Sequence, residues 1–212
     1  MRDTMTTDNR QAVRVTNKIL FACHPVSKET FQQIMDDFNN GISLYNRAEL
    51  ADVQVYIGAQ SALAKLKDKD EDLGTFLQHL DGKINLLLKK VDKSPSLLDT
   101  LVLQRVSIGA NGLAFWGDSE FTVNEIVEMQ IVLQPEHIFI NCFGSVVQCI
   151  SCESEEDDPS QKYRISVNFQ LIMDEDREEL IHYNFKQQSL ALKRRRLQKE
   201  CHKAGSSDLQ TS

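Results

Sequence analysis

The sequence contains no long apolar run. No stretch approaches the roughly 18 consecutive apolar residues that a membrane-spanning helix needs. The first ten residues, MRDTMTTDNR, also lack the apolar segment of a signal peptide. We therefore expect no membrane span and a cytoplasmic location.

Cysteine is scarce and odd in number, with five residues among 212. The cysteines fall mostly in strand-like runs, which suits reduced thiols that act as small apolar residues. Cys149 and Cys152 have CxxC spacing, but no second pair of Cys or His stands near them to complete a tetrahedral zinc site. We expect neither a bound metal nor redox chemistry.

The sequence also lacks a recognisable catalytic constellation. Its five histidines are scattered, and none stands beside a nucleophile at the spacing of a catalytic pair or triad. Asp68, Asp70 and Asp72 resemble half of a calcium-binding loop, but the glycine and the final glutamate of that loop are missing. We predict that the protein is not an enzyme.

An excess of positive charge is absent as well. The formal net charge of −7 argues against general nucleic-acid binding, so we expect no DNA partner. The end of the chain is locally basic, with LKRRR at 192–196. These residues fit the end of a solvated helix whose charges complement its dipole better than a dedicated phosphate site.

The hydrophobic content of 41% is enough for a real core, and the chain length suits one large domain or a small domain with an appendage. Residues 13–23 are rich in β-branched and apolar side chains and predict a strand. Ser27 is placed to cap a helix whose apolar residues continue to Tyr45. The next segment, 50–66, predicts a less regular helix with a break near Gly58.

Residues 73–91 carry the clearest helical pattern. Apolar residues there are spaced alternately four and three apart, which is the a/d step of a coiled coil: Leu73, Leu77, Leu80, Ile84, Leu87 and Val91. One interpretation is pairing with other copies of the chain, giving a dimer or tetramer through residues 27–93. The other is a hairpin within one chain between helices 31–45 and 73–91. Both hold together if two hairpins share a core.

After residue 96 the apolar period changes to two. Short runs bounded by turn residues, without crossover helices, predict an antiparallel sheet, with strands within 97–107, 111–118, 126–134, 137–153 and 162–172. With the strand at 13–23 the count reaches six, the size of a small barrel. QPEH at 134–137 is a predicted hairpin turn.

The chain ends in a predicted helix with acids at its start and bases at its end. Leu180, Ile181, Phe185 and Leu192 lie within one arc of this helix, so we expect them to cover the sheet. The fold class is thus α+β, a six-stranded antiparallel barrel with a C-terminal helix and a helical insertion. The predicted segments are a leader with the first strand, the insertion, the remaining barrel, the closing helix and a disordered tail: 1–26, 27–93, 94–173, 174–200 and 201–212.

Two short stretches carry a resemblance to a known family. RQAVR, Arg10 to Arg14, directly precedes the first strand, and SIGANG follows at residues 107–112. With the barrel pattern and the closing helix, these stretches resemble the PilZ domain, the bacterial receptor module for cyclic di-GMP. The helical insertion resembles the atypical, tetrameric branch of that family.

The resemblance implies a ligand site. The family's RxxxR motif is present at Arg10 and Arg14, and its (D/N)xSxxG motif aligns on SIGANG. The implied cyclic di-GMP contacts are two arginines, the residues of the loop and the neighbouring Arg105: Arg10, Arg14, Ser107, Gly109, Asn111, Gly112 and Arg105. Ser107 replaces the acid or amide and Gly109 replaces the serine, so only Gly112 keeps a defining residue of the second motif.

The sequence is compatible with two functions. In the first, the protein is a non-catalytic receptor that binds cyclic di-GMP between the arginines and the 107–112 loop and signals to a protein partner. In this view Gly109 and Gly112 allow positive φ and close approach of the backbone to the ligand. In the second, the protein is a barrel scaffold of the same fold that assembles through its helices and binds no nucleotide.

Overall fold

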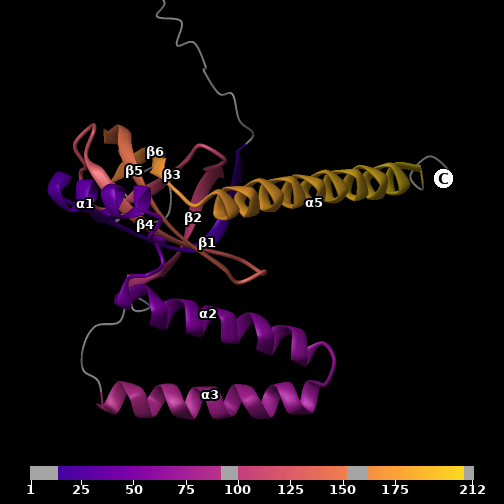
Figure 1. The fold of residues 1–212 in the computed structure, drawn as a ribbon. Helices are drawn as coiled ribbons and strands as arrows, with labels where there is room; N and C mark the ends of the chain where they lie inside the picture. The colour runs from indigo at the N-terminus through magenta and orange to yellow at the C-terminus, as the bar shows by residue number, and fades with distance from the viewer. Residues whose placement is uncertain (1–13, 92–99, 152–161, 208–212) are drawn as a thin grey trace, which may run out of the picture.

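The computed structural model describes residues 14–91, 100–151 and 162–207. The strands are β1 (Val15–Pro25), β2 (Val102–Gly109), β3 (Gly112–Gly117), β4 (Ile126–Leu133), β5 (Ile138–Ser151) and β6 (Tyr163–Leu171). The helices are α1 (Lys28–Asn39), α2 (Ala48–Lys67), α3 (Glu71–Val91) and α5 (Asp174–Ser207). Figure 1 shows a barrel, a helical hairpin beside it and one long helix that extends away from it.

The six strands form a closed antiparallel barrel in the order β1-β2-β3-β6-β5-β4. β1 closes the barrel because its first half pairs with β2 and its second half pairs with β4. Residues 134–137 connect β4 to β5, as predicted, with His137 in a left-handed conformation at φ 55°. The predicted fold class is therefore confirmed.

The barrel interior is filled by alternate residues of every strand. Ile19, Val106, Phe115 and Ile165 come from four adjacent strands, and all are buried. The rings of Phe21 and Phe115 have centroids 4.8 Å apart. Complete burial of each such side chain contributes roughly 1.5–3 kcal/mol to stability, so the barrel is the main source of stability in the molecule.

α1 begins as predicted, because the Ser27 side chain accepts a hydrogen bond from the backbone of Thr30. The apolar face of α1 packs over Phe143 and Leu171 on the outside of the barrel. The prediction that this helix continues to Tyr45 is wrong: α1 ends at Asn39, and Gly41 turns the chain with φ +84°. The apolar residues beyond the helix serve the barrel surface instead of a helix face.

The link between α1 and α2 is tied to the barrel by polar contacts. The Tyr45 hydroxyl donates to Asp176 at 2.6 Å and accepts from the backbone N–H of Asn141 at 3.1 Å. Arg47 forms an ion pair with Glu128, which also accepts from the Asn141 side chain. Because these partners lie on β4, β5 and α5, the link fixes the start of the α2–α3 insertion to the barrel.

The helical insertion is a hairpin of α2 and α3. α2 is continuous through Gly58, so the predicted break is wrong, and its first half packs through Val53 and Ile57 against Val132 of the barrel. The partner of α3 is α2, because α1 packs on the barrel; the predicted hairpin of helices 31–45 and 73–91 is therefore also wrong.

α5 closes one end of the barrel with its first turns and then leaves it (Figure 1). Leu180 and Tyr183 are buried in the barrel core, and the Tyr183 hydroxyl accepts from Asn17 at 3.0 Å. Phe185 and Leu192 are 59% and 55% exposed, so the prediction that these two residues cover the sheet is wrong. The helix also continues to Ser207, beyond the predicted end at residue 200.

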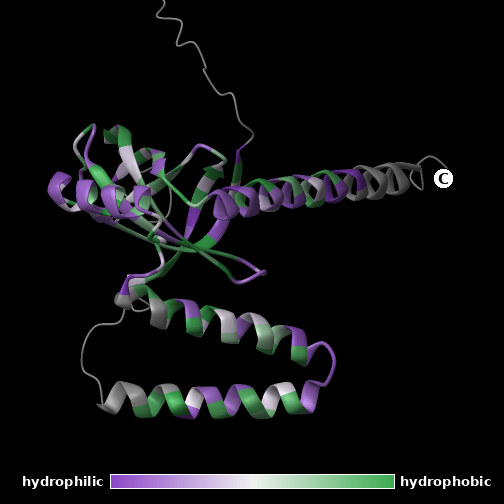
Figure 2. Ribbon diagram, in the orientation of Figure 1, coloured by the Kyte–Doolittle hydropathy of each residue, from purple (hydrophilic) through white to green (hydrophobic). Residues whose placement is uncertain are grey.

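The hydropathy of the residues agrees with a core in the barrel and with helices α3 and α5 that are partly open to solvent. Apolar residues concentrate on the strands, and both α3 and the outer part of α5 mix apolar and polar residues along their length (Figure 2). Among the described residues, no helix is both long and apolar enough to cross a membrane.

Candidate functional site

The register of β1 and β2 joins the two sequence stretches that the resemblance singles out. Val15 pairs with Ile108 and Thr16 pairs with Ser107. Arg14, which directly precedes β1 and is exposed, therefore lies at the level of Gly109 at the end of β2. Arg10 lies outside the described residues.

Ser107 belongs to a row of small residues across four strands. Ser107 pairs with Thr16 on one side and with Ala114 on the other, and Ala114 pairs with Ser166. Residues directly opposite each other in antiparallel strands place their side chains on the same face. The neighbouring residues Val106, Phe115 and Ile165 point into the core, so the row of small side chains lies on the outside of the barrel.

Basic side chains flank this row. Lys18 pairs with Arg105, and Arg164 pairs with Trp116, on the same outer face and two positions along each strand from the small residues. Lys18, Arg105 and Arg164 are exposed, and Trp116 is half-buried. We call this surface the basic face, defined by Arg14, Lys18, Arg105, Trp116 and Arg164.

The basic face suits an anionic, planar ligand. A guanidinium group meets phosphate with a planar pair of donors and also stacks on aromatic rings. An indole ring provides a second stacking surface. The small side chains between the charges leave room for a ligand to lie against the strands, and the hydroxyls of Ser107 and Ser166 can donate or accept hydrogen bonds.

The hairpin between β2 and β3 differs from its expected conformation. Among the described glycines the one with positive φ is Gly41, so Gly109 and Gly112 do not adopt the left-handed conformation that we predicted. At Gly112 the backbone does approach another group closely, but that group belongs to the neighbouring strand β6 and not to a ligand. A Cβ added to Gly112 would lie 2.2 Å from the carbonyl oxygen of Val167. Gly112 is therefore required for the packing of β3 on β6.

The hairpin tip is fixed from two sides. The carbonyl of Asn111 accepts from the backbone N–H of Phe169 at 2.9 Å, and the carbonyl of Ala110 accepts from Arg177 of α5 at 2.8 Å. The Asn111 side chain is exposed and the Ser107 side chain is half-buried. The hairpin is thus held in place before any ligand arrives, and Asn111 is available at its tip.

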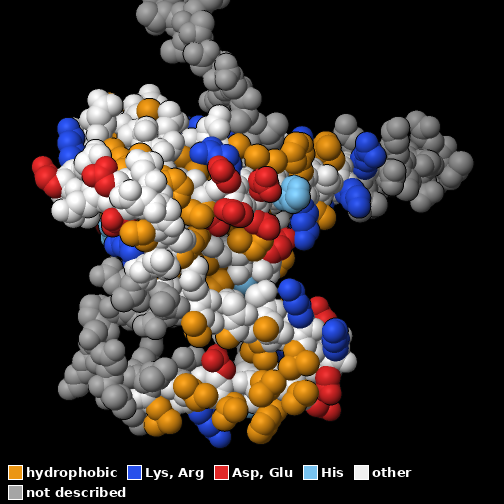
Figure 3. Space-filling view, in the orientation of Figure 1, with side chains coloured by type: hydrophobic (Ala, Val, Ile, Leu, Met, Phe, Trp, Pro, Cys, Tyr) orange, Lys and Arg blue, Asp and Glu red, His pale blue; other side chains and the backbone are white. Residues whose placement is uncertain are grey.

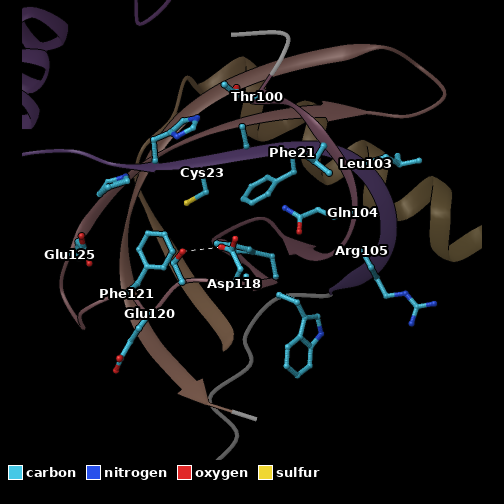
Figure 4. Close-up of a pocket in the computed structure, with 18 of the residues that line it drawn as sticks. Phe21, Cys23, Thr100, Leu103, Gln104, Arg105, Asp118, Glu120, Phe121 and Glu125 are labelled. Carbon is cyan, nitrogen blue, oxygen red and sulfur yellow. Dashed lines mark hydrogen bonds between the residues drawn. The ribbon is translucent and has the colours of Figure 1, made fainter. Parts of the chain in front are cut away.

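A cleft of 1220 Å³ opens next to the basic face, where β2 and β3 diverge. The two strands pair only from Val106 to Gly109, so the first half of β2 has β1 on one side and the cleft on the other. Lys18, Arg105 and Trp116 belong to both the cleft and the basic face. Figure 4 shows Phe21 directed into the interior and Arg105 extended outward from the rim.

The thiols near this cleft are poor nucleophiles. Cys23 lines the cleft, and burial, together with the charge of Glu125, raises the pKa of its thiol to about 12. Burial likewise raises the pKa of Cys142 well above its ordinary value. A thiolate is the reactive form, so neither residue is primed for covalent chemistry. Among the described residues, no group of three or more His, Cys, Asp or Glu side chains is placed to hold a metal ion.

Sequence reasoning missed three members of the basic face: Lys18, Trp116 and Arg164. Each lies on a strand, and a charged or aromatic residue at an outward position of a strand carries no local signal of binding. Trp116 lies four residues after Gly112 and was visible only as part of an apolar alternation. Knowledge of the register across β1, β2, β3 and β6 is needed to place these residues together.

The solved structures with folds similar to this chain include the following two. A new tetrameric PilZ domain from Xanthomonas campestris, which self-assembles through a helical bundle, matches with a TM-score of 0.45 and 11% identity over 86% of this chain and 92% of its own. The inhibitor of motility (MotI/DgrA) of Bacillus subtilis matches with a TM-score of 0.42 and 13% identity over 89% of this chain and 56% of its own. No family profile and no curated protein sequence matches the chain.

The first of these structures is a member of the family that the sequence resembles. At such low identity the likeness concerns the fold.

Proposed function

We propose that the protein is a non-catalytic receptor of the PilZ type that binds cyclic di-GMP on the basic face and passes the signal to a protein partner. The observation that carries the proposal is the pairing of Val15 with Ile108, which brings Arg14 to the level of the β2–β3 hairpin. Arg10 stands four residues before Arg14 in the RxxxR motif, and the proposal assigns it as the second guanidinium that binds the ligand.

The chemistry of the ligand matches the residues. Cyclic di-GMP carries two phosphate charges and two guanines, and each guanine offers its O6 and N7 acceptors to a bidentate guanidinium. Arg10 and Arg14 supply that geometry, and Lys18, Arg105 and Arg164 add positive charge. Trp116 provides an aromatic surface for a purine.

The altered second motif lowers the expected affinity. Ser107 makes a single hydrogen bond where an acid or amide makes two, and Gly109 has no hydroxyl. Each missing contact costs roughly 1–3 kcal/mol if it leaves a buried polar group unpaired. Binding therefore depends on the arginines more than on the hairpin side chains.

Trp116 gives a direct test, because it is the only tryptophan of the chain. Titration of the full chain with cyclic di-GMP should change the tryptophan fluorescence in a saturable way, since a ligand on the basic face alters the surroundings of the indole. GMP at the same guanine concentration should produce a much weaker change. A signal that does not saturate, or that GMP reproduces at equal concentration, contradicts the proposal.

The exposed face of α3 favours a second candidate function, an oligomeric scaffold that does not use the nucleotide. Four of the a/d residues of α3 remain open to solvent although α3 packs on α2: Leu73 is 44%, Leu80 45%, Ile84 49% and Leu87 62% exposed. Figure 3 shows apolar side chains along this surface of the hairpin. Burying such a row against another hairpin would form a bundle of helices from two or more copies.

Sedimentation of the full chain tests this second function. Ile84→Glu and Leu87→Glu together should lower the molecular mass, because each places a charge in the apolar contact. Val55→Glu is the matched control, since Val55 is also an exposed apolar residue of the hairpin, at 74%, but lies on α2 outside the a/d row. A monomeric wild-type protein would exclude the scaffold.

A further inference from the structure

The outer face of α5 carries a second seam, polar at its start and apolar around Ile181, Phe185 and Leu192, and the barrel leaves Phe185 and Leu192 exposed. Side chains on this face are spaced alternately four and three residues apart: Asp174, Glu178, Ile181, Phe185, Gln188 and Leu192. At 3.6 residues per turn the row lies about one third of a turn from the face that carries Leu180 and Tyr183 into the core. The helix therefore contacts the barrel on one side and presents the seam to solvent.

The apolar centre of the seam is open. Phe185 is 59% and Leu192 is 55% exposed, and the polar contacts of α5 with the rest of the described chain, among them those of Asp176, Arg177 and Lys186, lie nearer its first turns than Leu192 does. A helix in water gains most of its stability from packing of an apolar face, and Phe185 and Leu192 of α5 have little such packing against the described part of the chain.

The charges at the two ends of the seam are opposite. Acidic residues lie at and beside its first positions, at Asp174, Glu175 and Glu178. Basic residues follow its last position, at Lys193 and the three arginines 194–196. All of these side chains are exposed. Figure 3 shows acidic side chains where α5 leaves the barrel and basic ones farther out along the helix.

We propose that α5 pairs antiparallel with α5 of a second copy of this chain. Phe185 is the midpoint between Asp174 and Arg196, so an antiparallel pair centred on Phe185 places Asp174 of each copy opposite Arg196 of the other. The two Phe185 rings then meet at the twofold axis. Such an interface is isologous, because the same surface serves both copies.

A parallel pair is disfavoured by the same charges, because it places acids opposite acids and bases opposite bases. Like charges at these positions repel, and opposite charges set the orientation of helix pairs. The seam is also separate from the a/d row of α3, so this contact does not involve the α2–α3 hairpin.

Charge reversal tests the orientation. The measurements use the full chain with Ile84→Glu, which suppresses any association through α3, and sedimentation equilibrium gives the dimer dissociation constant. Asp174→Arg with Glu178→Arg should raise this constant at least tenfold, as should Arg195→Glu with Arg196→Glu. All four changes together should restore it to within about threefold, because each reversed end again meets its complement in the second copy.

Disulfide trapping tests the position of the axis. In a Cys201→Ser background, Phe185→Cys should form a disulfide-linked dimer at least tenfold faster than Leu190→Cys. Leu190 is the matched control, because it is 39% exposed but lies on the opposite side of α5. Equal rates for the two cysteines, or no restoration by the fourfold charge reversal, overturn the proposal.

Discussion

Val15 lies opposite Ile108 in the antiparallel pairing of β1 and β2. This pairing carries Arg14, which directly precedes β1, to the hairpin between Gly109 and Gly112, some ninety residues later in the chain. The basic face therefore combines residues from four strands that share one outer surface of the barrel. Its function as a nucleotide site rests on this register.

The strand residues of the basic face should contribute to ligand affinity. We expect Arg164→Ala and Lys18→Ala each to weaken cyclic di-GMP binding by about threefold to tenfold, because each removes one positive charge near the phosphates. Lys28→Ala is the matched control, since Lys28 is an exposed lysine on α1. Equal effects of Lys18→Ala and Lys28→Ala in a titration would place the ligand elsewhere.

Trp116 should act through its aromatic ring. Replacement by Ala should weaken binding by about tenfold, because base stacking on an aromatic side chain contributes roughly 1–3 kcal/mol. Replacement by Phe should retain most of the affinity, since a stacking surface remains. Calorimetry is the appropriate measurement, because both variants lose the fluorescent indole. Indistinguishable affinities for the Ala and Phe variants would argue against stacking.

Gly112 should be intolerant of any side chain. Gly112→Ala is expected to destabilise the fold by about 2 kcal/mol or more, because its Cβ would lie 2.2 Å from the carbonyl oxygen of Val167 on the paired strand. Gly58→Ala is the matched control: no atom lies within 4 Å of its Cβ, and alanine favours the helix by about 1 kcal/mol. Urea denaturation should show opposite signs for the two changes. Similar midpoints for both would contradict the packing described here.

Asp176 should make stability depend on pH. Burial, with smaller contributions from Glu175 and Glu179, raises the pKa of Asp176 to about 6, although the hydrogen bond from Tyr45 opposes the shift. The folded state therefore binds this proton more tightly than the unfolded chain does. The resulting stabilisation is complete below about pH 4 and is lost as the pH rises towards 6.

Asp176→Asn should flatten the fall in unfolding free energy between pH 4 and pH 6, because the amide does not titrate. The Tyr45 hydroxyl can still donate to the new side chain. Asp37→Asn, an exposed change on α1, should leave the slope as in the wild type. Denaturation at several pH values measures both, and an unchanged slope in Asp176→Asn would assign the dependence to other groups.

The sequence pattern predicted elements better than it predicted their partners. The heptad spacing of 73–91 located α3, and the period of two located every later strand, since both patterns are local. The end of α1 was missed because Ile42 and Tyr45 continue the helical spacing, although in the fold Tyr45 bonds to Asp176 on α5. α3 pairs with α2 because the apolar face of α1 is already packed on the barrel. The apolar spacing within a helix does not show which other element the helix packs against.

In the candidate site, too, local motifs were found from the sequence and contacts between distant strands were not. Arg14, Ser107 and Asn111 were found from motifs, and the structure places them at one end of β1 and β2. Lys18 and Arg164 join them only through pairing between strands that are distant in sequence. The positive φ of Gly109 and Gly112 was predicted from residue type alone. In the structure, Gly112 is needed because a side chain there would collide with the backbone of Val167.

The most direct measurement is a calorimetric titration of the full chain with cyclic di-GMP, alongside the variant Arg10→Ala, Arg14→Ala. The account predicts saturable binding by the wild type and a loss of at least a hundredfold in the variant, because both guanidinium groups leave the site. Lys28→Ala should bind as the wild type does. Absence of binding by the wild type, or equal binding by the double variant, would contradict the assignment of the basic face as a cyclic di-GMP site.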